Sequence, residues 1–221
     1  MKNKDCLYIS TCKNKCSASC VRYNQMRRLL ELSNLPKARQ ALQPIYSVDA
    51  DAKNYEKLGK IKKNIVSFVE QGKNLYICSN YCGNAKTSWA IKLMLKYFDQ
   101  TWHNSYDITR ALFVHVPTLL IDLKRFDDRP EYIDRILDAD LVVWDDFASS
   151  DKLTNYEHEQ ILRFIDYRLS SGKSNIYTSN VTNKEDLCKL VGQRLGSRVF
   201  TLSEVIEMKS DKDFRSAGGK H

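Results

Sequence analysis

The sequence lacks the features that would place the chain in or across a membrane. No apolar run approaches the ~18 residues that a membrane-spanning helix needs. The opening residues, MKNKDCLYISTC, contain no apolar segment typical of a secretory signal. We therefore expect no membrane association and a location in the reducing cytoplasm. Disulfide bonds are not expected there, so the seven cysteines are predicted to be free thiols or metal ligands.

Histidine is also scarce, with four in 221 residues, and the first is His103. Four cysteines lie close together near the start, at Cys6, Cys12, Cys16 and Cys20. Because no imidazole lies nearby, a metal held here would have thiolate ligands alone, as tetrahedral Zn²⁺ often does. The spacing C-x5-C-x3-C-x3-C departs from the common C-x2-C pairs, so an iron–sulfur cluster or free thiols remain alternatives. We predict a zinc site.

Acidic residues are under-represented in the first third of the chain. Residues 1–75 contain 15 Lys and Arg against 6 Asp and Glu, a difference of +9; the remainder, with 20 against 21, has −1. This asymmetry indicates an acidic partner, either nucleic acid or an acidic protein face, although a solvated linker is an equal alternative. The length and 43% hydrophobic content fit one ordinary domain, residues 51–221, preceded by a basic Cys-rich segment with a linker, residues 1–50.

The stretch NYCGNAKTS, residues 80–88, lacks glycine at two positions where a phosphate-binding loop normally has it. An apolar run at 75–78 precedes it, as a buried strand would, and apolar residues at 89–95 follow it at helical spacing. The pattern approaches G-x-x-x-x-G-K-[ST], in which backbone N–H groups hold phosphates, Lys86 reaches the β- and γ-phosphates and Thr87 holds Mg²⁺. The alternative is an ordinary strand-to-helix turn with an exposed lysine.

Asn80 and Ala85 occupy the two glycine positions. Asn tolerates a left-handed backbone, whereas Ala85 adds a Cβ that is expected to weaken nucleotide binding. The residues predicted to bind ATP are Asn80, Cys82, Gly83, Asn84, Ala85, Lys86, Thr87, Ser88 and Asp145.

Two adjacent carboxylates, Asp145 and Asp146, follow the buried strand expected at 141–144. Open α/β sheets bind ligands beyond the carboxyl ends of their strands. We predict that Asp145 binds Mg²⁺ together with Thr87, and that Asp146 orients or deprotonates the attacking water. An Asp-rich turn is less favoured, because the strand follows a phosphate loop in the expected order.

Further candidate residues lie at the end of the next strand and on a later helix. Asn180 follows the strand expected at 175–178, where its amide could position the hydrolytic water; an Asn in a turn is the alternative. Arg194 and Arg198 are four residues apart, on one helical face. A planar guanidinium suits a γ-phosphate, in the same chain or on a neighbouring subunit, but surface ion pairs are equally consistent with the spacing.

The remaining periodicity predicts an alternation of helices and strands. Besides the helix after the phosphate loop, we expect helices at 21–32, 55–69, 118–126, 132–137, 155–169 and 185–195. Besides the strands named above, we expect strands at 111–116 and 199–207. His115 is interpreted as a core or edge residue rather than a ligand, and Gly72 as a helix cap.

Taken together, the Cys cluster, NYCGNAKTS, LVVWDDF, IYTSN, GQRLGSR and DFRS resemble the DnaC/DnaI-type replicative helicase loaders, especially their phage-encoded relatives. The match to the ATPase part covers about residues 57–216. It implies an α/β fold: an AAA+ P-loop core with a five-stranded parallel sheet, a lid that is absent or reduced, and a small Cys-rich N-terminal zinc-binding domain.

The resemblance also implies roles for individual residues. It equates Lys86 and Thr87 with Walker A, Asp145 and Asp146 with Walker B, and Asn180 with sensor 1. It further equates Arg198, with Arg194 beside it, with the arginine finger, and Arg215 with the sensor 2 arginine. The family's DNA-contacting region makes Lys124 and Arg125 candidates for single-stranded DNA binding. The departures at Asn80 and Ala85 bear on tight binding and fast turnover of nucleotide, not on the fold.

The activity that the resemblance implies is a slow, DNA-stimulated ATPase used as a switch. ATP between subunits assembles an arc or ring, which grips single-stranded DNA and holds a hexameric replicative helicase open, while the N-terminal domain contacts the helicase. Three alternatives remain: a transposition helper of the same clade, a zinc-binding replication adaptor with a vestigial nucleotide site, and a small-molecule P-loop kinase. The arginine pair, the Cys cluster and the missing kinase lid disfavour the last.

Overall fold

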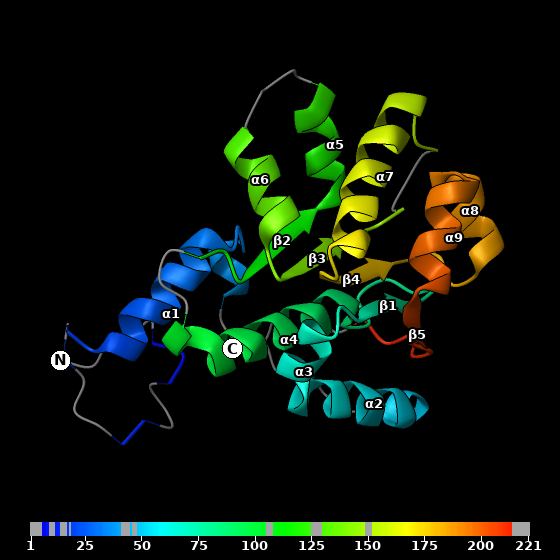
Figure 1. Cartoon of the computed structure of the whole chain (residues 1–221). Coiled ribbons are helices and arrows are strands. Elements are labelled where there is room, and N and C mark those ends of the chain that lie inside the picture. The colour runs from blue at the N-terminus through cyan, green and yellow to red at the C-terminus, as the bar shows by residue number, and fades with distance from the viewer. Residues whose placement is uncertain are drawn as a thin grey trace.

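A computed structural model of the chain describes residues 6–8, 12–13, 17, 19–40, 45, 48–104, 108–124, 130–148 and 152–213. Its centre is a five-stranded sheet between two layers of helices (Figure 1). The strands are β1 (Asn74–Cys78), β2 (Ala111–His115), β3 (Leu141–Asp145), β4 (Ser174–Ser179) and β5 (Ser203–Glu207). Their order across the sheet is β2-β3-β4-β1-β5, and every neighbouring pair is parallel.

The strand order brings the chemically important strand ends together. β1, β3 and β4 occupy the middle of the sheet and are buried along their whole length. β1 and β3 are largely apolar, as strands covered on both faces usually are, whereas β4 also buries the polar residues Ser174, Asn175 and Thr178. Since all strands run the same way, the loops that follow β1, β3 and β4 emerge side by side at one edge. The five-stranded parallel α/β sheet predicted from the sequence is confirmed.

Alternate residues of each strand face opposite helical layers. Leu75 and Ile77 of β1 pack into one hydrophobic cluster, whereas Tyr76 and Cys78 pack into the other. The first layer contains α1 (Val21–Leu32), α2 (Ala52–Lys63), α3 (Ile65–Glu70) and α4 (Lys86–Thr101). The second contains α5 (Val116–Lys124), α6 (Pro130–Asp138), α7 (Asn155–Ser170), α8 (Lys184–Val191) and α9 (Gln193–Thr201), which lie above the sheet in Figure 1. Short 3-10 turns are Lys37–Arg39, Asp49–Asp51 and Trp102–Asn104.

Helix α1 is packed onto the same core as the sheet, although the sequence placed it before the ATPase domain. Its buried residues Met26 and Leu29 belong to the cluster on the α4 side. Just beyond α1, the Ser33 carbonyl accepts a 2.7 Å hydrogen bond from the Phe113 N–H and so covers the exposed edge of β2. The division of the chain at residue 50 stays a prediction.

An ionic contact fastens the start of α1 to the end of α4. Arg22 and the Tyr8 hydroxyl both donate to Asp99, at 2.6 and 2.7 Å, and the Arg22 guanidinium lies 3.6 Å from the Tyr8 ring centre. Burial raises the pKa of the Asp99 carboxyl, but hydrogen bonds from Lys96, Tyr8 and Arg22 outweigh it, so that its pKa falls below the usual value. Asp99 is therefore ionised and holds the N-terminal segment at neutral pH.

The observed elements differ from the expected ones at a few boundaries. The helix expected at 55–69 is broken at Asn64 into α2 and α3, and the helix expected at 185–195 ends at Gly192, whose φ of +88° is left-handed. The last strand starts at Ser203 rather than 199, because residues 199–201 complete α9. The cap predicted at Gly72 is confirmed, with φ +62° and its N–H bonded to Val69.

The described residues after β5, 208–213, contain no helix. Within the described part of the chain, no helix has the length and apolar character required to span a bilayer.

Candidate functional site

The predicted phosphate loop connects β1 to α4 in the structure. Gly83 has φ +76° and Ala85 has φ +70°, and left-handed residues in such a turn direct successive backbone N–H groups toward one side. Helix α4 then begins at Lys86 and continues for 16 residues, and no side chain among the described residues caps its N-terminus by a hydrogen bond. The loop therefore presents the N–H groups and the positive helix end that an anion needs.

Hydrogen bonds hold the Lys86 side chain against the predicted phosphate loop. Its Nζ donates to the Tyr81 carbonyl at 2.8 Å and to the Asn84 Oδ1 at 3.2 Å, and the residue is 7% exposed. Asn84 is itself buried and donates to the Ser79 hydroxyl. Beneath the loop, burial, with a smaller effect of Glu207, raises the pKa of the Cys78 thiol to about 12, so this thiol stays protonated. Hydrogen bonds within the loop thus position the Lys86 ammonium group.

Asp145 joins the phosphate loop to β3 and β4. Its Oδ1 accepts hydrogen bonds from the Thr87 hydroxyl at 2.7 Å and from the Thr178 hydroxyl at 2.8 Å, and the residue is 1% exposed. These contacts connect residues 58 and 33 positions apart along the chain. The structure therefore brings together the two residues, Thr87 and Asp145, that the sequence assigned to Mg²⁺.

Asp146 occupies an unusual backbone conformation beside Asp145. Its φ is +56°, and its N–H donates to the Thr178 hydroxyl at 3.1 Å. Its carboxylate lies on the surface, 3.4 Å from the His115 Nε2, while the His115 Nδ1 is 2.8 Å from the Thr118 hydroxyl. Left-handed backbone in a non-glycine residue is strained and is common at functional sites. The turn points the second carboxylate outward, toward the side from which water would approach.

His115 is a site residue that sequence reasoning missed. It ends β2 and pairs in register with Asp145 of β3. Ligand atoms of His115, Asp145 and Asp146 all lie within 4.8 Å of one another. The sequence interpretation as an edge residue is right about its place in the sheet but overlooked what faces it. Only the pairing of β2 with β3 could have revealed this contact.

Arg39 was also missed, because it lies in the segment taken as a linker. Its Nη1 is 3.4 Å from the Asp145 Oδ2, so a cation from the N-terminal segment reaches the predicted Mg²⁺ ligand. The Arg39 side chain is about half exposed and lies near the Phe113 ring. A guanidinium at this distance offsets part of the buried negative charge of Asp145.

Hydrogen bonds join the end of β4 to the loops that follow β3 and β1. The Ser179 hydroxyl donates to the Phe147 carbonyl at 2.6 Å, beside the Walker B turn. The Thr182 hydroxyl donates to the Asn80 Oδ1 at 3.2 Å, beside the phosphate loop. Asn180, the predicted sensor 1 residue, stands between these two contacts and its side chain is exposed. Its position between the two loops suits the water-positioning role predicted for it.

The arginine pair lies away from the phosphate loop of its own chain. On α9, Arg198 Nε is 2.6 Å from the Asp166 Oδ1, and Arg194 Nη2 is 3.5 Å from the Asp166 Oδ2. Arg198 lies one turn before the end of α9, close to the start of β5, whereas the phosphate loop follows the opposite end of the paired strand β1. Five-residue strands separate these edges by roughly 13 Å. An action of Arg198 on the nucleotide of its own chain is therefore disfavoured.

The predicted DNA contact Lys124 ends α5 and forms a 2.9 Å ion pair with Glu157. Glu157 also completes a capping box with Thr154 at the start of α7. Burial raises the pKa of Glu157, but hydrogen bonds from Lys124 and Thr154 lower it overall. Lys124 thus fastens α5 to α7 while most of its side chain stays exposed. Arg125 and Arg215 lie outside the described residues.

The predicted zinc ligands are only partly described. Cys6, Cys12 and Cys20 are free thiols, and Cys16 lies outside the described residues. Among the residues that the structure describes, these thiols do not gather into a group with ligand atoms close enough to share a metal ion. Neither the zinc prediction nor its iron–sulfur alternative gains support from the structure.

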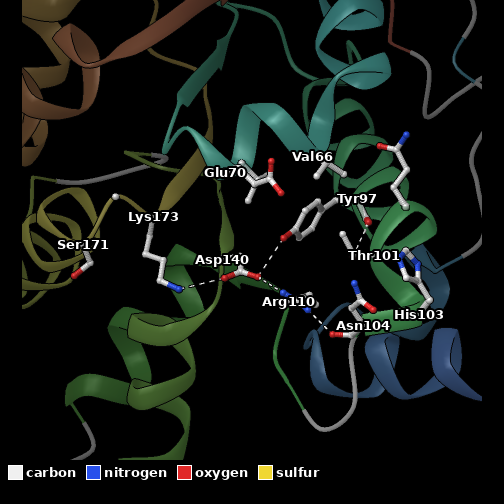
Figure 2. Close-up of a pocket in the computed structure, with 13 residues that line it drawn as sticks. Val66, Glu70, Tyr97, Thr101, His103, Asn104, Arg110, Asp140, Ser171 and Lys173 are labelled. Atoms are coloured by element: carbon white, nitrogen blue, oxygen red, sulfur yellow. Dashed lines mark hydrogen bonds and ion pairs between the residues drawn. The ribbon is translucent and has the colours of Figure 1, made fainter.

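A polar cavity of about 430 Å³ lies at the opposite edge of the sheet, where the strands begin (Figure 2). Its two cations contact Asp140, which accepts hydrogen bonds from Arg110 at 3.0 Å and Lys173 at 3.2 Å as well as from the Tyr97 hydroxyl at 3.1 Å. Burial, with Asp140 adding to it, raises the pKa of the Tyr97 hydroxyl, which remains a donor. Because Asp140 already binds both cations, this cavity is a structural junction of β2, β3, β4 and α4 rather than an anion site.

The residues at the phosphate-loop edge fit a magnesium nucleotide. The hydroxyl of Thr87 and the carboxylate of Asp145 are hard oxygen ligands of the kind that Mg²⁺ prefers. Two buried donors, Trp89 Nε1 in the first turn of α4 and the Tyr55 hydroxyl of α2, have no partner among the described residues, and their rings lie 5.6 Å apart. Unpaired buried donors are rare and mark a place where a polar ligand atom can bind.

No protein-family model matches the sequence, and no curated protein matches it. Solved structures do match. The DnaC helicase loader superposes with a TM-score of 0.63 at 20% identity, over 83% of this chain and 99% of that one. DnaI superposes with a TM-score of 0.64 at 20% identity, over 83% and 97% of the two chains. AMPPCP-bound DnaA from Aquifex aeolicus superposes with a TM-score of 0.55 at 17% identity, over 79% of this chain and 53% of that one.

These likenesses establish architecture rather than activity. The identities of 20% and below show similarity of fold alone. The chain therefore shares its α/β fold with the DnaC helicase loader, DnaI and DnaA.

Proposed function

We propose that the chain is an ATP-dependent loader of a hexameric replicative helicase onto single-stranded DNA. The observation that carries the proposal is the 2.7 Å hydrogen bond from the Thr87 hydroxyl to the buried Asp145, beside the phosphate loop. That contact joins the two Mg²⁺ ligands of a P-loop ATPase across 58 residues, in a fold that superposes on a protein described as a helicase loader.

Each residue of the edge has a distinct task in this proposal. The loop N–H groups and Lys86 bind phosphates, and Thr87 and Asp145 hold Mg²⁺. Asp146 takes a proton from the attacking water, and Asn180 orients that water. Bound Mg²⁺–ATP supplies the phosphoanhydride that is hydrolysed. Few side chains take part in this proposed chemistry, and Ala85 has a strained backbone. Both features fit the slow turnover that suits a switch.

The arginine pair supports assembly as part of the proposal. Since Arg198 lies far from the loop of its own chain, the nucleotide it can reach is that of a neighbouring subunit. Hydrolysis of ATP bound between two subunits would then depend on assembly into the arc or ring that the sequence resemblance implies. Lys124, exposed at the end of α5, is the described candidate for contact with single-stranded DNA.

The central test is the ATPase rate of the full chain, with and without single-stranded DNA and a candidate hexameric helicase. We expect DNA-stimulated hydrolysis that falls at least ~10²-fold in Lys86→Ala and in Asp146→Asn. Asp134→Asn, which changes an exposed carboxylate on α6, serves as the matched control and should retain full activity. Hydrolysis unaffected by Lys86→Ala would refute the proposal and leave an adaptor with a vestigial nucleotide site.

Assembly is tested by mixing two inactive variants. Arg198→Ala keeps an intact phosphate loop and Lys86→Ala keeps an intact arginine, so mixed assemblies should recover activity if the arginine acts on a neighbour. Asp166→Asn releases Arg198 without removing it. If Arg198 merely fastens α9 to α7, Asp166→Asn should abolish activity as fully as Arg198→Ala, and mixing should restore nothing.

A further inference from the structure

The residues that follow β5 turn across the phosphate loop. We call residues 208–213 the C-terminal strap. The Met208 N–H donates to the Cys78 carbonyl at 2.8 Å, which extends the pairing of β5 with β1 to the last residue before the loop. The Ser210 carbonyl then accepts a 3.4 Å hydrogen bond from the Asn84 side chain, inside the loop itself. The strap therefore touches the loop rather than leaving the sheet for solvent.

A buried carboxylate holds the strap from its other side. Asp51, which is 0% exposed, accepts hydrogen bonds from the backbone N–H groups of Lys209 at 2.7 Å and Ser210 at 3.0 Å. Asn54 donates to the same carboxylate at 3.0 Å and to the Glu207 carbonyl at 2.7 Å. Backbone hydrogen bonds to an ionised carboxylate are among the stronger ones in proteins. The middle of the strap is thus anchored, and only its last residues are left to reach over the loop.

The last described residue of the strap places a carboxylate on the loop. A Cβ at position 83 would overlap both the carboxylate carbon and the oxygens of Asp213, so this side chain lies directly against the Gly83 backbone. Gly83 is the glycine in the middle of the loop and has φ +76°. Its missing side chain is what allows the close approach. A carboxylate therefore lies directly against the loop whose backbone is predicted to bind phosphates.

We propose that Asp213 is a built-in competitor for the phosphate loop, so that the strap and nucleotide phosphates occupy the same face of the loop one at a time. The proposal rests on the function proposed above, since it needs the loop to bind phosphate. Like charges a few ångströms apart repel strongly wherever water is partly excluded. Asp213 is exposed on its outer side, so it can swing away without opening the core. The strap lowers the apparent affinity for nucleotide by the fraction of molecules in which it is closed.

The experiment compares nucleotide affinity of the full-length wild type with Asp213→Asn, which removes the charge and keeps the size. Isothermal titration calorimetry with Mg²⁺–ADP and with Mg²⁺–ATPγS measures Kd. We expect Kd to fall at least about fivefold in the variant, the factor for a strap closed in four molecules of five. Adenosine, which lacks phosphates, should bind equally to both proteins, because nothing in it competes with the carboxylate.

The matched control is Asp211→Asn, which makes the same change of charge on an exposed residue two positions earlier. It should leave Kd at the wild-type value. Equal, measurable binding by wild type and Asp213→Asn would overturn the strap proposal and leave the proposed function intact. Equal tightening by both substitutions would also overturn it, since a general field effect would explain the gain. If none of the proteins binds either nucleotide, the proposed function fails and the strap proposal fails with it.

Discussion

Ala85→Gly is expected to stabilise the protein, although glycine substitutions usually do the opposite. Ala85 precedes α4 with φ +70° and ψ 12°, a left-handed conformation that costs an L-residue about 1–2 kcal/mol. Glycine removes that cost but adds about 0.4–1 kcal/mol of conformational freedom to the unfolded chain. The difference leaves a net gain of roughly 0.5–1 kcal/mol in the free energy of unfolding.

Urea denaturation followed by tryptophan fluorescence measures this gain. With a slope of about 2 kcal/mol per molar urea, the midpoint should rise by roughly 0.3–0.5 M. Ala90→Gly is the matched control on the same helix, because Ala90 is fully buried inside α4. It loses about 1 kcal/mol of helix propensity and about 0.8 kcal/mol for a buried methyl group, so its midpoint should fall.

The direction in which the urea midpoint moves shows whether the backbone at position 85 is strained. A midpoint that falls in Ala85→Gly, as it does in Ala90→Gly, would show that position 85 is not strained. The reasoning about the missing second glycine of the loop would then be refuted. If the midpoint rises, nucleotide affinity should also be measured, because a relaxed loop is expected to bind phosphate at least as tightly as the wild type.

Two further predictions concern the charged junctions of the fold. Asp140→Asn should lower the free energy of unfolding by about 1–2 kcal/mol in urea denaturation, because three donors lose their ionised acceptor; Asp134→Asn, on the exposed face of α6, should be neutral, and an equal loss in both would contradict this. The lowered pKa of Asp99 makes its stabilisation complete at neutral pH and progressively lost as pH falls below about 4. Asp99→Asn should therefore be less stable than wild type at pH 7 and indistinguishable from it well below pH 4, and a constant difference would exclude the ion pair as its cause.

The sequence predicted most of the fold because the relevant signals are local. Apolar runs mark β1 and β3, which are buried on both faces, and 3.6-residue periodicity marks α1, α4 and α7. Errors occurred where a single residue interrupts a pattern that otherwise continues. Asn64 breaks one expected helix, and residues 199–201 look like strand but complete α9. Propensity alone could not decide these boundaries, because packing against the sheet overrides it.

The sequence predicted only those site residues that belong to a recognisable motif. Lys86, Thr87 and Asp145 follow a spacing that the chemistry of phosphate and Mg²⁺ imposes, and the structure brings Thr87 and Asp145 together. The spacing of Arg194 and Arg198 left open which chain they serve. Both arginines form ion pairs with Asp166, as the alternative of surface ion pairing expects, so the arginine-finger role stays a prediction that the mixing of variants tests.

The sequence by itself determined the alternation of helices and strands, the candidate phosphate loop and the acidic strand end, since residues that are neighbours along the chain encode each of them. The five-stranded parallel sheet was implied by the family resemblance. Tertiary structure alone decided that His115 faces Asp146, that Arg39 reaches Asp145, and that Asp213 lies on Gly83. These contacts join residues from 31 to 130 positions apart. The first follows from the pairing of β2 with β3 and the last from the pairing of β5 with β1, in the order β2-β3-β4-β1-β5. No local pattern encodes that order, because paired strands lie far apart along the chain, as Asn74 of β1 and Asn175 of β4 do.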